Sequence, residues 1–138
     1  GAFIHDLGNM AVPEEVLRKA DDLNEQEREL MKVHTIMGDS MAKQLDFPAE
    51  VRPVVRSHHE QWAGTGYPDR LVGEEIPLSA RIVSLADVYD ALTSPRSFRS
   101  AYSREEALEV MHRDAEKMFD PRLFGVFESM MKKGGFDA

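Results

Sequence analysis

The sequence contains no cysteine and no long apolar run, and both absences narrow what the chain can be. Without cysteine, the 138 residues form no disulfide and offer no thiolate to a metal ion. Any metal site must therefore use histidine, aspartate or glutamate, ligands that suit iron, manganese, zinc and magnesium. No stretch approaches the roughly 20 apolar residues of a membrane span. We also see no signal peptide, so we expect a cytoplasmic chain with no membrane segment of its own.

Basic residues are also scarce. The chain has 17 Lys and Arg against 25 Asp and Glu, which gives a formal net charge of −8. So acidic a chain is not expected to bind DNA or an anionic membrane through general electrostatics. An anionic small substrate is compatible with this charge if bound metal ions supply local positive charge. The length and the 42% hydrophobic content predict one globular domain over residues 1–138.

Helical signals dominate the chain, and no stretch alternates apolar and polar residues over the length of a strand. Prolines, N-cap residues and a Ser-x-x-Glu capping box indicate where helices begin. We predict helices over residues 12–20, 25–45, 49–61, 77–93, 103–117 and 120–133, and the end of a further helix over residues 1–8. The predicted fold class is all-α, a bundle of about six to seven helices.

The predicted helix over residues 25–45 carries an apolar stripe at helical spacing. Its members are Leu30, Val33, Met37, Met41 and Leu45. His34 lies beside this stripe, so its position fits either a functional histidine or a partly buried core histidine. The helix alone does not decide between these two interpretations.

A second pair of histidines introduces a glycine-rich loop. His58 and His59 end a predicted helix, and the sequence continues EQWAGTGYP to residue 68. Glycine permits backbone angles that other residues avoid and proline fixes them, so we expect this loop to have one definite conformation. Adjacent histidines point in different directions and can share a centre only if it lies between them. For the pair alone, a polar helix end facing solvent is the alternative explanation.

Four of the five histidines and two aspartates could share one centre. These residues are His5, Asp6, His34, His58, His59 and Asp87. One ion takes four to six ligands, so six protein ligands with added waters fit two ions better. A carboxylate such as Asp6, directly after a ligating histidine, can bridge two ions. Paired ions lower the pKa of bound water and hold phosphoryl oxygens, which indicates a phosphoester hydrolase. A solvated Asp87 is the alternative for that position.

Several motifs of the chain resemble those of the HD-GYP family, a branch of the HD phosphohydrolases. They are HDLG at 5–8 followed by His34, HHEQWAGTGYP at 58–68 and ADVYDALTS at 86–94. SFRSAYSREEAL and the FDP at 119–121 match the pattern too, so the resemblance covers essentially the whole chain. It implies an HD-domain helical bundle and a bacterial signalling enzyme that hydrolyses cyclic di-GMP to the linear dinucleotide and, in many members, to GMP.

The resemblance also implies roles for individual residues. The six histidines and aspartates would hold two divalent ions, iron or manganese first, with zinc, nickel and magnesium as alternatives, and Asp6 would bridge them. Arg96, Arg99 and Asp90 are the candidates for substrate binding, since the planar fork of arginine suits phosphate. Solvated loop charge is the alternative for both arginines.

The signature loop of the family would shape the edge of the site and contact diguanylate cyclase domains. Its residues here are Gly64, Gly66, Tyr67 and Pro68. A plain packing residue is the alternative for Tyr67.

The chain departs from the family pattern at two places. The family reads HDxGK, whereas this chain has Asn9 at the lysine position, three residues after Asp6. The resemblance makes Asp6 and Asn9 the candidate catalytic residues. Asparagine can form hydrogen bonds but carries no charge and cannot act as a general acid. Family members also carry about two helices before the HD pair, which often supply a further histidine, so we expect an N-terminally truncated domain. Two alternatives stay open: a degenerate module that binds cyclic di-GMP or a partner protein, and a phosphohydrolase acting on another nucleotide.

Overall fold

A computed structural model of the chain describes residues 2–19, 22–95 and 99–133. Within these ranges it contains seven α-helices and three short 3-10 helices, and Ala63 and Val72 pair only in an isolated bridge. The predicted all-α class and number of helices are therefore confirmed. No helix in the described part of the chain is long and apolar enough to cross a bilayer.

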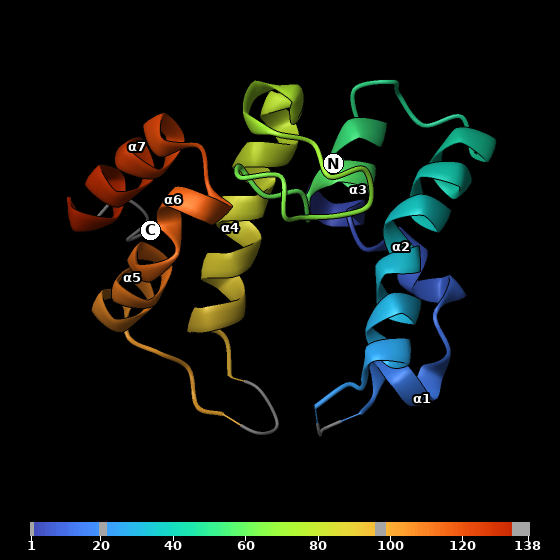
Figure 1. Ribbon diagram of the computed structural model, residues 1–138, viewed down its shortest axis with the longest axis horizontal. Helices are drawn as coiled ribbons and strands as arrows, with labels where there is room; N and C mark the ends of the chain where they lie inside the picture. Colours follow the sequence, from blue (N-terminus) through green and yellow to red (C-terminus); the bar gives the residue numbers. More distant parts are fainter. Residues whose placement is uncertain (1, 20–21, 96–98, 134–138) are drawn as a thin grey trace.

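Helix α4 stands in the middle of the molecule, with α1 to α3 on one side and α5 to α7 on the other (Figure 1). The α-helices are α1 (Glu14–Leu17), α2 (Glu25–Gln44), α3 (Arg52–Ser57), α4 (Leu78–Thr93), α5 (Arg104–Arg113), α6 (Ala115–Met118) and α7 (Pro121–Lys132). The 3-10 helices are η1 (Ala2–Ile4), η2 (Leu7–Ala11) and η3 (Gly73–Glu75). Helix α2 packs against η2 and α3, and α3 packs against α4.

Three helices begin where their capping residues predict. Asn24 and Ser103 each form a complete capping box, which satisfies backbone N–H groups at the starts of α2 and α5. The Asp120 carboxylate accepts hydrogen bonds from two backbone N–H groups at the start of α7. These caps are local features, which is why the sequence alone locates them.

Other predicted boundaries are wrong. The predicted helix over 49–61 is shorter in the structure, where α3 ends at Ser57. The chain after it forms the loop, whose backbone donates hydrogen bonds to the buried carboxylate of Glu60. The predicted helix over 103–117 is interrupted at Asp114, which allows Met118 and Phe119 to reach the core beside α4. Residues 1–8 do not end an α-helix; the described part forms η1 and the start of η2.

The apolar stripe of α2 is not its buried face. Leu30, Val33, Met37 and Leu45 are all exposed. The buried residues of α2 are His34, Thr35, Gly38 and Ala42. The reason is the close approach of η2, since a Cβ on Gly8 would lie 1.7 Å from the carbonyl oxygen of His34. Gly8 and Gly38 allow η2 and α2 to approach this closely, and the face of α2 that contacts η2 includes the buried His34.

Two sets of buried side chains lie on either side of the site. Leu85, Met111, Phe119 and Phe124 form a cluster between α4, α5 and α7. An ion pair of 2.7 Å between Arg81 of α4 and Asp120 joins the same elements. On the other side, Val54 and Val55 of α3 are buried. The histidine-rich site lies between these sets, where η2, α2, α3 and α4 meet.

Candidate metal centre

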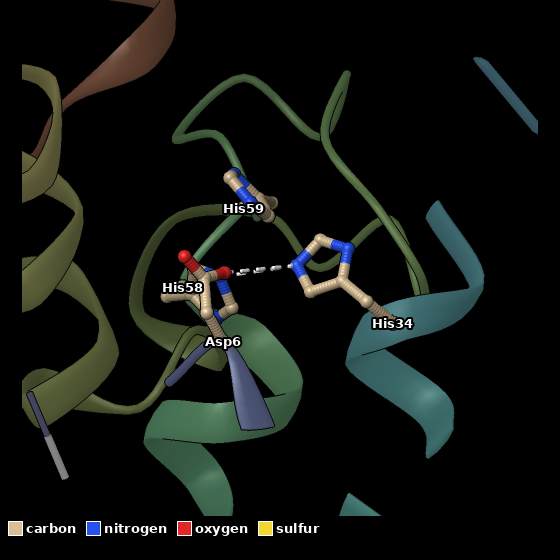
Figure 2. Close-up of side chains that lie close together, drawn as sticks. All are labelled: Asp6, His34, His58 and His59. Atoms are coloured by element: carbon tan, nitrogen blue, oxygen red, sulfur yellow. Dashed lines mark hydrogen bonds and ion pairs between the residues drawn. The ribbon is translucent and has the colours of Figure 1, made fainter. Parts of the chain in front are cut away.

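Four of the predicted ligands converge at this junction. Asp6 precedes η2, His34 lies on α2, and His58 and His59 follow α3 directly. Each residue offers one ligand atom, and these atoms all lie within 4.8 Å of one another. Figure 2 shows the four side chains pointing toward one another. The start of η2, the middle of α2 and the end of α3 thus place three imidazoles and one carboxylate together.

The remaining two predicted ligands lie beside this group. His5 Nε2 is 3.4 Å from Asp6 Oδ2 and 3.4 Å from Oδ1 of Asp87, which projects from α4. The His5 and His58 rings are 4.9 Å apart between centroids. All six residues named from the sequence therefore share one site, although their roles as ligands stay a prediction.

Asp6 occupies the middle of this site. Its Oδ1 lies 3.6 Å from His34 Nε2 and 3.8 Å from His58 Nε2, whereas its Oδ2 faces His5. The two carboxylate oxygens thus face two different groups of side chains. This is the arrangement that a carboxylate bridging two cations requires.

Backbone hydrogen bonds orient the histidine rings. Nδ1–H of His34 donates to the carbonyl oxygen of Met31 at 2.5 Å, and Nδ1–H of His58 donates to that of Val55 at 3.0 Å. With Nδ1–H donated to the backbone, each ring directs Nε2 toward the site, as is usual for metal-binding histidines. These two Nε2 atoms are only 3.4 Å apart. A cation near two such close imidazole nitrogens is favourable, and with the Asp6 carboxylate beside both of them these residues fit a divalent metal ion.

Electrostatics favour the same conclusion. Burial and the neighbouring histidines lower the pKa of His59 to about 3, and burial lowers the pKa of His58, so both rings are neutral at pH 7. Hydrogen bonds from His5 lower the pKa of Asp6 and of Asp87. The two carboxylates in turn raise the pKa of His5 to about 10. The site thus combines the neutral rings of His58 and His59 with two ionised carboxylates, and a metal ion that binds His5 would displace the proton that these carboxylates stabilise.

The signature loop encloses His59. The Tyr67 ring stacks on the His59 ring, with centroids 4.9 Å apart and an interplanar angle of 26°. Gly66 is required here because a Cβ would lie 2.5 Å from the carbonyl oxygen of His59. Gly64 adopts a φ of 78°, which favours glycine, and the Tyr67–Pro68 peptide is cis. Burial raises the pKa of the Tyr67 hydroxyl. The loop therefore has one definite shape and forms a wall of the site.

The sequence analysis missed Glu60, which holds this loop. Its side chain is only 2% exposed. The carboxylate accepts a hydrogen bond of 2.7 Å from the backbone N–H of Asp69 and another of 3.0 Å from that of Leu71. A buried carboxylate needs such partners. The position of Glu60 directly after the two histidines could have indicated a role in the site. Its hydrogen-bond partners are nine and eleven residues away, so no local sequence pattern predicts them.

Asn9 lies on η2 within the site region. Its side-chain Oδ1 is buried and has no hydrogen-bond partner among the described residues. A buried amide oxygen without a partner is costly, so a bound group or water at this position would be stabilised.

The structure describes two of the three predicted substrate-binding residues. Asp90 is exposed on α4. Arg99 donates to the carbonyl oxygens of Ala91 at 2.9 Å and Leu92 at 3.2 Å, so it stabilises the end of α4. Arg96 lies outside the described residues. A substrate contact of any of the three stays a prediction.

Comparisons with known proteins identify the family of the chain. The sequence profile of the HD domain family matches residues 1–123. The cyclic di-GMP phosphodiesterase response regulator RpfG of Xanthomonas campestris pv. campestris is 42% identical over 123 residues, which cover 88% of this chain and 32% of that protein. A cyclic di-GMP phosphodiesterase of Vibrio cholerae is 37% identical over 139 residues, covering 96% of this chain and 28% of that protein.

Among solved structures, a cyclic GMP-AMP-specific phosphodiesterase of Vibrio cholerae superposes with a TM-score of 0.67 and 26% identity. This match covers 94% of the chain and 36% of that structure. The chain thus spans about a third of the length of these relatives. With its paired HD residues in a shared histidine site and a profile match over most of its length, the chain belongs to the HD domain family.

Proposed function

We propose that residues 1–138 are an HD-GYP domain that hydrolyses cyclic di-GMP to the linear dinucleotide, GMP or both. The observation that supports this most strongly is that all six predicted ligands share one site, in which the two oxygens of Asp6 face different partners. The relatives named as cyclic di-GMP phosphodiesterases support the substrate class. A cytoplasmic location stays a prediction.

In this proposal two divalent ions bind among the six ligands, iron or manganese in the first place. When bound, such ions lower the pKa of water and offset the charge of a phosphodiester. His34, His58 and His59 would hold one ion, His5 and Asp87 the other, and Asp6 would bridge them. The backbone hydrogen bonds of His34 and His58 fix their rings before metal binds.

The signature loop orients the site and limits water access around His59. Tyr67 covers one face of the His59 ring, and Glu60 keeps the loop in place. The exposed part of the same loop is also our candidate for contact with diguanylate cyclase domains. Thr65 and Asp69 are exposed there.

The test incubates purified chain, loaded with Mn²⁺ or Fe²⁺, with cyclic di-GMP and follows linear products by chromatography. We expect turnover that a chelator abolishes and metal restores. Binding of cyclic di-GMP without product over hours would contradict the enzymatic proposal.

The second candidate is a module that binds cyclic di-GMP without cleaving it, and Asn9 favours it. Asn9 replaces an expected lysine, and its buried Oδ1 has no partner among the described residues. Replacing Asn9→Lys should raise kcat by about tenfold or more, because a charged contact to phosphate contributes roughly 1.5–3 kcal/mol. Asn9→Met is the matched neutral control and should not raise kcat. An unchanged rate in Asn9→Lys would show that a missing cation does not limit turnover.

A further inference from the structure

A groove of about 510 Å³ lies between α2 and the signature loop, outside the set of six ligands. Its α2 wall includes Lys32, Val33 and Ile36, and its loop wall runs from Gly64 to Arg70. The volume falls within the range of about 300–1,000 Å³ typical of small-molecule sites. The roles assigned so far involve the loop wall of this groove but not its α2 wall.

Tyr67 connects the groove to the metal centre. One contact of its ring is the stack on His59. The Lys32 Nζ lies 5.7 Å from the centroid of the same ring. A single aromatic side chain therefore separates the Lys32 ammonium group from a predicted metal ligand. The groove and the predicted metal centre thus share Tyr67 as a common wall.

The groove is lined by two basic residues, Lys32 and Arg70, and one acidic residue, Glu29, on a chain whose net charge is −8. Lys32 Nζ contacts Glu29 Oε1 at 2.5 Å, which holds the ammonium group at the rim and leaves two of its three N–H donors available. Arg70 is exposed and pairs with no carboxylate among the described residues. It also adopts a φ of 56°, a backbone conformation that is strained for a side chain of this size. Such strain is concentrated at functional positions.

The remaining surface of the groove is apolar. Val33 is 38% exposed and Ile36 is 46% exposed, so both offer apolar contact area. Two cations beside apolar and aromatic surface suit a ligand that joins an anionic phosphate to a flat base. A nucleotide has this combination, whereas an apolar peptide or a simple inorganic anion uses only half of it.

We propose that this groove binds the second nucleotide of a cyclic dinucleotide, the half whose phosphodiester is not being cleaved. Lys32 and Arg70 bind the non-reacting phosphate, and the base lies against Val33 and Ile36. The inference rests on the proposed function and adds a specificity site to it. Lys32 and Arg70 distinguish a cyclic dinucleotide from a small phosphodiester that occupies only the metal centre.

The test compares the wild-type chain with the double variant Lys32→Gln/Arg70→Gln and with Lys43→Gln, a control at the exposed far end of α2. Equilibrium binding is measured by calorimetry with a phosphorothioate analogue of cyclic di-GMP, which resists cleavage. We expect the double variant to bind at least about tenfold more weakly, because hydrogen bonds to charged groups are lost. The control should bind like the wild type.

A second measurement follows hydrolysis of bis(p-nitrophenyl) phosphate, which has a reacting phosphodiester but no second nucleotide. The double variant should cleave it at the wild-type rate. Unchanged affinity of the double variant for the analogue would overturn the inference and leave the proposed function standing. An equal loss with both ligands would also overturn it, since the damage would then lie at the metal centre. Failure of metal-loaded wild type to bind the analogue would overturn both proposals.

Discussion

Asp87 and Asp90 lie three residues apart on α4, yet their surroundings differ. Asp87 Oδ1 is 3.4 Å from His5 Nε2, and hydrogen bonding to His5 lowers the pKa of Asp87. Asp90 is exposed and faces Ser94 at 3.4 Å. The same residue type on one helix thus provides one predicted ligand and one natural control.

Replacing Asp87→Asn should reduce bound metal from about two equivalents to about one. A ligating carboxylate is removed, and even outer partners of a metal site contribute about 10–100-fold in affinity. Elemental analysis after gel filtration measures the content. Asp90→Asn should keep the wild-type value, and full metal content in Asp87→Asn would remove this residue from the ligand set.

At the residue scale, the sequence was sufficient to name the six predicted ligands, because five fall in recognisable short motifs and His34 follows the HDLG motif as in the family pattern. It was not sufficient for Glu60 or Lys32, whose partners lie in other elements. Glu60 binds backbone groups nine and eleven residues further on. Lys32 lies over a tyrosine from a distant loop. Contacts of this kind depend on how helices pack, and no local pattern predicts them.

At the scale of elements, the approach of η2 to α2 places Asp6 next to His34. A Cβ on Gly8 would lie 1.7 Å from the carbonyl oxygen of His34 and 2.7 Å from the backbone nitrogen of Gly38. Both neighbours are backbone atoms, which cannot move aside as a flexible side chain can. The geometry of the site therefore depends on a glycine that binds nothing itself.

Replacing Gly8→Ala should lower the free energy of unfolding by about 3 kcal/mol or more, because the overlap must force η2 away from α2. Gly125→Ala on α7 is the matched control. A Cβ there meets nothing within 4 Å, so this change should raise stability by about 0.5–1 kcal/mol. Urea unfolding measures both, and a Gly8→Ala variant as stable as the wild type would disprove the close approach.

Glu60 has a comparable role for the signature loop. Replacing Glu60→Gln should destabilise the chain by about 2 kcal/mol, because the new amide group faces a backbone N–H instead of accepting from it. Metal affinity should fall as well, since the loop no longer holds Tyr67 against His59. Urea unfolding with chelator and a separate metal titration measure the two effects. Glu50→Gln, at an exposed position, serves as the control. A Glu60→Gln variant with normal metal affinity would show that metal binding does not depend on the loop conformation.

The boundaries of the elements show where sequence patterns are insufficient. Asn24, Ser103 and Asp120 are local caps and correctly predicted helix starts. The early end of α3 and the break at Asp114 were not predicted, because each results from a contact with another part of the fold. The exposed apolar stripe of α2 has the same cause, since the close contact with η2 selects small residues for the buried face.

At the scale of the whole molecule, an ion pair between Arg81 and Asp120 joins α4, which carries Asp87, to α7. The Asp120 side chain is 2% exposed, and its Oδ2 lies 2.7 Å from Arg81 Nη1. Burial alone would raise the pKa of Asp120, but hydrogen bonds from Arg81 and from the backbone of Arg122 and Leu123 lower it. Its contribution to stability is therefore present above its ordinary pKa of 3.8 and is lost as the pH falls through the lowered value.

Replacing Asp120→Asn should destabilise the chain by about 3 kcal/mol at pH 7, because Arg81 is left without a buried counter-charge. Asparagine keeps an oxygen for the cap of α7, so the change isolates the charge. The difference from wild type should shrink as the pH falls below about 4. Urea unfolding at several pH values measures it, and a difference that does not vary with pH would contradict the assignment.

The central claim is that chain segments distant in sequence assemble one centre for two metal ions around Asp6. Anomalous X-ray diffraction from crystals of the manganese-loaded chain tests it most directly. The account predicts two anomalous peaks that both contact the Asp6 carboxylate, one beside His34, His58 and His59 and one beside His5 and Asp87. A single peak, or peaks that do not contact Asp6, would contradict it.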